Sequence, residues 1–418
     1  MNKNLRAWLL YDAGNSFIVS ATGGLFLAQW FVLDKGIPEA WYGFAFSAAT
    51  VFVLLSSPII GAWSDTLGYR KPFINFFTIA LLLAGSLMIF TTNVAGFGNL
   101  FPLLTLLLFF FVQYTYQLSF LFFNTLLEKL SSKQTLARIS GLSTLYNQIA
   151  YVLANAILLL FAMGKITLIG IPGRSQVFLP AVVICTIFSL PLILQFQEKR
   201  TVKEGSTRQT SALAETIGGI RMLFKKERNV GVFLLGFSFV SDALLTISLY
   251  FALVMNELYR MSDVQKLIAI SLMYVCAGLI GALLGKVAGR FGMKRSLLFM
   301  ALMLTGSFTV ALLGSNFSVL LVTLIFAGIG WGGFYSLTRA MLIRIAPPAR
   351  LGEYFGFYST FERFASIIGP TIWGVIVTWL AVTGGFRYRI AGITEVVLMV
   401  IGIVLLSKVK VSRSYGKL

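Results

Sequence analysis

Charged side chains inside apolar stretches are the residues of this sequence that could do chemistry. Asp12 and Asp242 each lie within a long apolar segment of a 418-residue chain that contains no histidine. A charge in hydrocarbon is costly, and it usually faces a partner or a path for ions or protons. Any proton carrier here must be a carboxylate, and we expect Asp242 to be the better candidate. The alternatives are a structural carboxylate bonded to Ser or Thr hydroxyls for Asp242, and a helix cap or a pair with Arg6 for Asp12.

A second group of charges, Arg339, Glu362 and Arg363, lies in two apolar segments near the end of the sequence. An ion pair between Arg339 and Glu362 would neutralise both charges, and a closed network of this kind that only holds helices together would explain the group. If Arg363 instead faces a cavity, its natural partner is a carboxylate of a bound solute, which an arginine binds through two parallel hydrogen bonds.

Neutral polar residues recur at helical spacing in two other apolar segments. Gln113 and Gln117 share one face of a helix, as do Asn147, Tyr151 and Asn155, because residues four apart lie on the same side. Such faces indicate either a wet lining or interhelical hydrogen bonds of modest energy. The candidate substrate or coupling residues are therefore Asp12, Asn15, Gln113, Gln117, Asn147, Tyr151, Asp242, Arg339, Glu362 and Arg363.

Several other kinds of chemistry lack the residues they need. Cys185 and Cys276 lie singly in apolar segments, so they make neither a disulfide framework nor a metal site. Without histidine there is no Ser-His-Asp catalysis, and no phosphate loop of the form G-x4-G-K-[ST] marks a primary pump. We expect no enzymatic activity, no metal and no cofactor.

The composition predicts a membrane protein. Of the residues, 57% are hydrophobic and 12% are charged, whereas about a quarter of a soluble domain is charged. The net charge of +19 is spread over alternate loops between apolar stretches, which argues against a single basic face for nucleic acid. We expect a multi-pass protein of the plasma membrane, or of the inner membrane in a Gram-negative bacterium, with lipids around it.

Twelve apolar segments are long enough to cross a bilayer as helices, which takes about 20 residues each. They are continuous rather than alternating, which excludes a barrel. The polar segment 196–229 separates a six-helix N-terminal half, residues 1–195, from a six-helix C-terminal half with a short basic tail, residues 230–418. Basic residues concentrate on the side that holds this segment and both termini, which predicts cytoplasmic termini. The expected spans are 7–33, 41–63, 73–93, 101–125, 140–163, 177–195, 230–255, 264–286, 296–314, 318–344, 354–381 and 389–407.

Within the central segment, residues 212–224 could form an amphipathic helix on the membrane surface. A simple tether between the halves explains the segment equally well.

One short pattern occurs once in each half, 224 residues apart: Gly61-x3-Asp65-x2-Gly68-x-Arg70-Lys71 and Gly285-x3-Gly289-x2-Gly292-x-Lys294-Arg295. Each copy lies between two apolar segments, which indicates a duplicated transporter whose halves move against each other. By this offset, Asp12 matches Gly236 and Asp242 matches Ile18, so the two aspartates are not equivalent.

The pattern also has a mechanical interpretation as a conformational latch. We expect Gly61 to permit close helix approach and Gly68 a tight turn. Asp65 would accept hydrogen bonds from a neighbouring helix N-terminus, where the dipole favours an anion. Because Gly289 replaces this carboxylate in the second copy, Asp65→Asn should disturb conformational switching far more than a polar change at Gly289. The alternative is a pair of plain basic turns.

The pattern and the six-plus-six arrangement resemble the major facilitator superfamily of transporters, over the whole chain. Four segments are similar to a narrower branch, that of the yeast vacuolar amino-acid effluxer linked to autophagy and its bacterial relatives. These are Tyr11-Asp12-Ala13-Gly14-Asn15-Ser16; Phe123-Asn124-Thr125-Leu126-Leu127 with Arg138-Ile139-Ser140-Gly141; Ser336-Leu337-Thr338-Arg339; and Pro347-Pro348-Ala349-Arg350 with Glu353-Tyr354-Phe355-Gly356-Phe357-Tyr358 and Gly369-Pro370.

The resemblance implies a monomer that moves a small polar solute by alternating access, with proton-coupled efflux of amino acids or related metabolites as one form. The chain departs from the branch at Ala13-Gly14, at Asp242-Ala243 and over 142–148, where the branch has Trp-Ala, Asp-Gly and a glycine-rich stretch. Those spans line the cavity in this fold, so the substrate stays open. Import, or export of drug-type compounds, is the alternative within the fold, and a receptor or scaffold without transport is the alternative outside it.

Overall fold

Helix is the regular secondary structure of the described part of the chain. A computed structural model describes residues 3–93, 100–130, 136–198, 200, 212–347 and 350–411, and no strand occurs among them. Within these ranges, the side chains at 128–129, 136–138, 140–141, 144–145, 212–217, 281–289 and 352 lie outside the description. The chain divides into two compact units. Unit 1 comprises Met1–Leu213 with Leu249–Leu253, and unit 2 comprises Ala214–Ser248 with Val254–Leu418.

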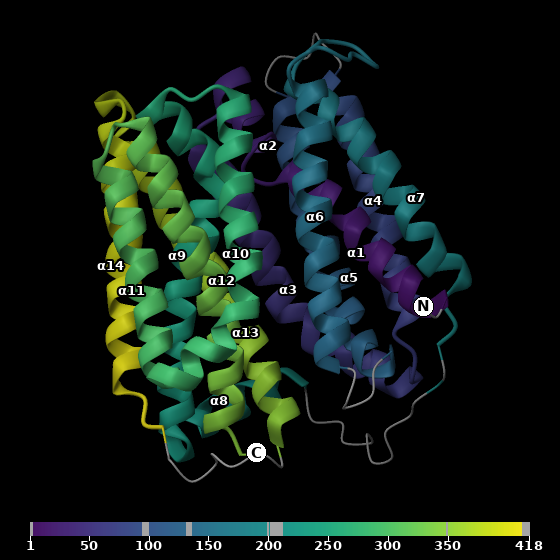
Figure 1. The fold of residues 1–418 in the computed structure, drawn as a ribbon. Coiled ribbons are helices and arrows are strands. Elements are labelled where there is room, and N and C mark those ends of the chain that lie inside the picture. The colour runs from purple at the N-terminus through teal and green to yellow at the C-terminus, as the bar shows by residue number, and fades with distance from the viewer. Residues whose placement is uncertain are drawn as a thin grey trace. The chain divides into compact units, whose positions relative to one another are not determined.

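Unit 1 is built around a long first helix (Figure 1). Helix α1 packs against α6 and α7, α4 packs against α5 and α7, and α3 packs against α5. The elements are α1 (Lys3–Thr22), α2 (Leu27–Gln29), the π-helix η1 (Trp30–Asp34), α3 (Glu39–Leu67), α4 (Lys71–Asn93), α5 (Leu100–Leu130), α6 (Leu136–Ala162), the 3-10 turn η2 (Arg174–Val177) and α7 (Phe178–Gln195).

Unit 2 repeats this order of packing. Helix α11 packs against α12 and α14, α10 packs against α12, and α13 packs against α14, as their counterparts α4, α3 and α6 do against α5 and α7. This internal repetition agrees with the duplicated pattern in the sequence. The elements are α8 (Ala212–Lys226), α9 (Arg228–Tyr259), α10 (Asp263–Phe291), α11 (Met293–Leu313), α12 (Phe317–Ile345), α13 (Leu351–Trp379), η4 (Ala381–Thr383) and α14 (Phe386–Lys408).

Eleven of the twelve expected spans correspond to one helix each, to within a few residues at their ends, and ten helical segments of the described chain are long and apolar enough to cross a membrane. Helices α6 and α13 are not among the ten. Only Tyr146–Ala162 of α6 counts as an apolar stretch, and it is shorter than a span. Helix α13 carries both Glu362 and Arg363 in its middle, which lowers its mean hydropathy. A multi-pass membrane protein is therefore confirmed.

The first expected span, 7–33, is not one continuous helix. Helix α1 ends at Thr22, and the chain resumes as α2 and η1 only from Leu27. At Gly23 a Cβ atom would lie 2.5 Å from the Val19 carbonyl oxygen, so only glycine fits this tight end. The break frees the Thr22 carbonyl, and the buried Tyr42 hydroxyl donates to it over 2.9 Å. In hydrocarbon, a broken helix is tolerated where other groups satisfy the freed backbone in this way.

Two small residues of α12, Gly328 and Gly332, bring α10 and α12 into backbone contact. A Cβ on Gly328 would lie 2.3 Å from the Met273 carbonyl oxygen, and one on Gly332 would lie 2.1 Å from that of Ala277. In lipid, helices associate through close packing because the surrounding tails are equally apolar. These glycines therefore serve packing in unit 2.

The central segment contributes helix α8, which docks on unit 2. Leu223 is fully buried in the core cluster of that unit, and Phe224 lies against Phe361 of α13 with ring centroids 6.3 Å apart. A Cβ on Gly219 would lie 2.8 Å from the Phe357 ring. The segment therefore contains the helix that the sequence suggests, and Leu223 anchors it to unit 2.

Candidate functional site

In unit 1, Asp12 is held by polar side chains of α6. Ser143 Oγ donates to Asp12 Oδ2 over 2.8 Å, and Asn147 Nδ2 donates to Asp12 Oδ1 over 3.0 Å and to Ser16 Oγ over 3.2 Å. Asp12 itself is 4% exposed. The described contacts contain no ion pair with Arg6, so that alternative is wrong. Ser143 and Asn147 lie four residues apart and therefore reach α1 from one face of α6.

In unit 2, Asp242 has a different environment near the middle of α9. It is 2% exposed, and its Oδ1 accepts a hydrogen bond of 2.9 Å from the backbone N–H of Gly369 on α13. A Cβ on Gly369 would lie 2.1 Å from Thr246 Oγ1 and 2.9 Å from Asp242 Oδ1. Glycine is required here because the backbone of α13 presses directly onto the carboxylate. The described bond comes from this backbone, not from the Ser or Thr hydroxyl that the alternative interpretation expects.

A second buried carboxylate, Glu395 of α14, lies within electrostatic range of Asp242. Glu395 is fully buried, and neither carboxylate oxygen has a hydrogen-bond partner among the described residues. Our sequence analysis missed this residue, although the signal was present, since Glu395 is an acid in the middle of an expected span. It belongs with Asp242 as an intramembrane charge.

The group on α12 and α13 is arranged more loosely than the sequence suggests. Glu362 is half-buried and lies within electrostatic range of both Arg339 and Arg363. The described contacts contain no ion pair within 4 Å between Arg339 and Glu362, and Arg339 is exposed. The Tyr358 hydroxyl nearby bonds to Thr338 Oγ1 over 3.0 Å. The Arg339–Glu362 pair is therefore not formed, and the wider network around Arg363 stays a prediction.

The remaining candidates of unit 1 fall into separate contacts. Gln117 Nε2 donates to Thr50 Oγ1 of α3 over 3.1 Å, an interhelical bond of the kind weighed above. Asn15 Oδ1 lies 4.0 Å from Cys185 Sγ, and its buried Nδ2 has no hydrogen-bond partner among the described residues. The remaining two are Gln113, which is buried, and Tyr151, which is half-buried and whose carbonyl accepts from Asn155 over 2.9 Å.

In the first copy of the repeated pattern, Asp65 pairs with an arginine of its own loop. The Arg70 guanidinium forms an ion pair with Asp65 Oδ1 and donates to Ser64 Oγ over 2.5 Å. Gly68 adopts a left-handed conformation with φ +74° at the end of α3, as the predicted tight turn requires. Nothing lies within 4 Å of a Cβ at Gly61, so the close approach expected there is not made.

The helix N-terminus beside this loop is bound by a different acid. Glu198 accepts from the backbone N–H of Arg70 over 2.9 Å and from that of Lys71 over 2.7 Å, at the start of α4. Lys71 Nζ in turn donates to the Phe196 carbonyl at the end of α7 over 2.7 Å. An anion at a helix N-terminus and a cation at a C-terminus are both favoured by the helix dipole. The contact expected of Asp65 is thus made within unit 1 by Glu198.

The second copy keeps the basic contact without the acid. Lys294 Nζ donates to the Ser407 carbonyl, in the last turn of α14, over 2.6 Å. Gly292 has φ +87°, which again requires glycine, and Arg295 is exposed. Gly285 lies in α10 among the positions whose side chains fall outside the description.

The Pro-Pro-Ala-Arg segment anchors the start of α9. Arg350 donates two parallel hydrogen bonds to Glu353, of 2.8 and 2.7 Å, and lies 3.8 Å from Glu227. The Tyr354 hydroxyl also donates to Glu227, which precedes α9. Pro348 and Ala349 lie outside the described residues, as do the side chains of Arg138, Ser140 and Gly141. This part of the resemblance therefore marks a structural contact within unit 2.

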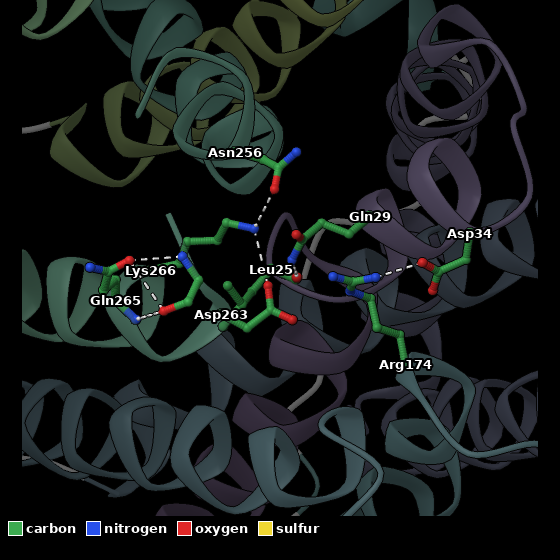
Figure 2. Close-up of polar contacts among 9 residues, drawn as sticks. Leu25, Gln29, Asp34, Arg174, Asn256, Asp263, Gln265 and Lys266 are labelled. Carbon is green, nitrogen blue, oxygen red and sulfur yellow. Dashed lines mark hydrogen bonds and ion pairs between the residues drawn. The ribbon is translucent and has the colours of Figure 1, made fainter. Parts of the chain in front are cut away.

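Short polar contacts also fix loops within each unit (Figure 2). In unit 1, Arg174 forms an ion pair of 2.5 Å with Asp34. In unit 2, the buried Lys266 donates to Asp263 over 3.0 Å and to Asn256 over 3.3 Å. Over the described ranges, no group of three or more acids, cysteines or histidines is placed to hold a metal ion.

The fold and the buried acids in its helices are those of a transporter of the major facilitator type. The MFS-type transporter YxiO of Bacillus subtilis (strain 168) is 24% identical over 97% of this chain and 94% of its own. The nucleoside transporter NupG superposes with a TM-score of 0.74 at 15% identity, covering 98% of this chain and all of that one. The D-xylose–proton symporter superposes with a TM-score of 0.76 at 13% identity, covering 99% of each chain.

Within that class, a family model described as vacuole effluxer Atg22 like matches residues 39–417. The chain belongs to this family.

Proposed function

We propose that this transporter couples the movement of a small polar solute to protons, with efflux of amino acids or related metabolites as the primary activity. The observation that carries the coupling is Asp242, a buried carboxylate in the middle of α9, in a chain without histidine. An ionisable group at this depth is rarely retained without a functional role. The description of the family as vacuole effluxers supports the direction, and proton coupling is supported by the D-xylose–proton symporter, which has the same fold.

Each unit, taken by itself, has polar groups suited to bind a solute. In unit 1 these are Gln113, Gln117, Tyr151 and Asn15, whose buried amide nitrogen has no hydrogen-bond partner among the described residues. In unit 2, Arg363 or Arg339 would bind a carboxylate of the solute, which favours an amino acid over a neutral sugar. Import of the same solutes and export of drug-type compounds are the alternatives within the fold.

The membrane arrangement is part of the same proposal. Twelve crossings with both termini in the cytoplasm follow from the Lys and Arg distribution, in a plasma membrane or bacterial inner membrane. One chain would suffice for activity, because both halves of the fold are present in it. The two pattern loops would act as latches, with Asp65 in the first having no acidic counterpart in the second.

The decisive experiment uses purified protein in liposomes with an imposed pH gradient and a panel of labelled solutes, amino acids first. We expect accumulation of at least one solute that depends on the gradient and is lost in Asp242→Asn. Glu257→Gln, on the same helix, is the matched control and should behave as wild type. Accumulation that ignores both the gradient and Asp242→Asn would contradict coupling through this residue. Failure of every solute to move would favour the receptor or scaffold.

A further inference from the structure

We infer that Glu395 is the second member of the coupling site and that it shares one exchangeable proton with Asp242. This inference rests on the proposed proton coupling and names the residues that would carry it. The site would consist of Asp242 and Thr246 of α9, Gly369 of α13 and Glu395 of α14.

The register of α9 and α14 places these acids together. Near one end, Asn229 Nδ2 donates to the Lys410 carbonyl over 2.8 Å, and Lys410 N donates back to Asn229 Oδ1 over 2.7 Å. About two turns further along α9, a Cβ on Gly402 would lie 2.8 Å from the Gly236 carbonyl oxygen. The two helices therefore run antiparallel.

At the other end of the pair, a Cβ on Gly385 would lie 3.8 Å from Cγ of Glu257. The two helices thus touch at Gly402 and at Gly385, and Glu395 lies between these positions on α14. Because both helices rise by about 1.5 Å per residue, counting from either contact places Glu395 opposite the turn of α9 that holds Asp242 and Thr246. The electrostatic action of Asp242 on Glu395 agrees with that register.

Cations are held away from these two acids. On α9, the charged residues other than Asp242 are Arg228 and Glu257, each about four turns away. On α14, Arg389 is the nearest cation in sequence, and it donates to the Leu313 carbonyl over 2.9 Å at the end of α11. Helix α11 places its charges, Lys294 and Arg295, in its first turn.

Helix α13 and the aromatic neighbours complete the surroundings. Arg363 lies six residues, or about 9 Å along the helix, from Gly369 and has Glu362 beside it. Tyr388 of α14 lies against Trp373 with ring centroids 6.3 Å apart. On α12, Tyr335 packs edge-on against Phe237 of α9. Among the described groups named here, none is placed to neutralise the charge of Asp242 or Glu395. A proton on one of the two carboxylates is therefore the remaining way to lower the charge of the site.

One shared proton resolves the chemistry of this site. Two buried carboxylates within electrostatic range of each other are costly to ionise together. The buried oxygens of Glu395 and Thr246 Oγ1 have no hydrogen-bond partners among the described residues, and unsatisfied polar groups are costly in such a site. A protonated Glu395 becomes a donor that can bond to the Asp242 carboxylate. Release and rebinding of that proton would then change the charge of the site by one.

Infrared difference spectroscopy on the purified full-length protein tests the shared proton without reference to transport. We expect a carbonyl stretch of a protonated carboxylic acid at neutral pH, which shifts in deuterium oxide, is lost in Glu395→Gln and changes in Asp242→Asn. Glu257→Gln should leave it unchanged. A spectrum without this band, or a band that neither substitution of the pair alters, would overturn the inference.

Transport separates this inference from the proposed function. In liposomes, Glu395→Gln should lose gradient-driven accumulation by tenfold or more while solute exchange across the membrane persists, because exchange needs no net proton movement. Full accumulation by Glu395→Gln would overturn its role. Accumulation driven by a sodium gradient in wild type would assign a cation in place of the proton. A wild type that ignores the pH gradient contradicts the proposed function, whereas the spectrum still decides whether the proton is shared.

Discussion

The two buried aspartates of this protein have the same burial and opposite surroundings. Asp12 in unit 1 receives hydrogen bonds from Ser143 and Asn147, two side chains that can solvate a negative charge. Asp242 in unit 2 receives one backbone hydrogen bond and has another acid, Glu395, within electrostatic range. Both side chains are less than 5% exposed.

The difference shows that depth in the membrane does not by itself define a role. Hydrogen bonds to a carboxylate stabilise its charged form, whereas a neighbouring acid opposes it. Asp12 therefore ties α1 to α6 through side-chain hydrogen bonds, whereas Asp242 is a better candidate for a proton-carrying group because a second acid lies within electrostatic range. The duplication of the fold has not produced two copies of one site, which agrees with the unequal positions of the aspartates in the repeat.

The largest expected effect separates the two aspartates in transport. Asp242→Asn should reduce gradient-driven accumulation by tenfold or more, because an amide cannot carry a proton. Asp12→Asn should reduce accumulation only a few-fold, because it weakens the contact between α1 and α6 and removes no proton carrier. A hydrogen bond to a charged group contributes about 1.5–3 kcal/mol to stability. Initial rates and plateau levels in liposomes give both numbers. Equal losses would mean that both acids act in coupling and would break the comparison.

The next effect concerns the glycine that presses on Asp242. Gly369→Ala introduces a methyl group where a Cβ would lie 2.1 Å from Thr246 Oγ1, and such overpacking costs about 1–3 kcal/mol. Reversible unfolding in mixed micelles measures the free energy of unfolding. Gly356→Ala, on the same helix, is the control. Nothing lies within 4 Å of its Cβ position, so the exchange should be neutral or stabilise the helix by about 0.5–1 kcal/mol.

A smaller effect tests the polar contact between α1 and α6. Asn147→Ala removes one of the two side chains that bind Asp12, and interhelical hydrogen bonds of this kind average about 0.6 kcal/mol and reach about 1.7. Asn155→Ala is the matched control, since Asn155 donates to the Tyr151 carbonyl of its own helix. If the two variants lower the free energy of unfolding equally, the bonds of Asn147 add nothing to helix association.

The sequence predicts the positions of the helices well because lipid demands long apolar stretches and helices that satisfy their own backbone. It fails where several helices meet. The break after Thr22 is signalled by Gly23 and Gly24, yet only the Tyr42 hydroxyl of another helix makes it tolerable. The sequence identifies Asp242 as a candidate only because this acid lies deep inside a long apolar segment. That Glu395 stands beside it depends on the register of α9 and α14, which no spacing in the chain expresses.

The smallest expected effect compares Glu198 with Asp65 at the start of α4. Glu198 accepts two backbone N–H groups there, and an acid at a helix N-terminus contributes about 0.3–1 kcal/mol. Asp65 is 40% exposed in its pair with Arg70, and exposed pairs contribute about 0.2–1 kcal/mol, less at high salt.

Glu198→Gln should therefore lower the free energy of unfolding at both low and high salt, whereas the loss in Asp65→Asn should vanish at high salt. If the loss in Glu198→Gln also vanishes, its bonds to α4 are only surface electrostatics. Glu198 would then contribute no more to the stability of unit 1 than an exposed ion pair does.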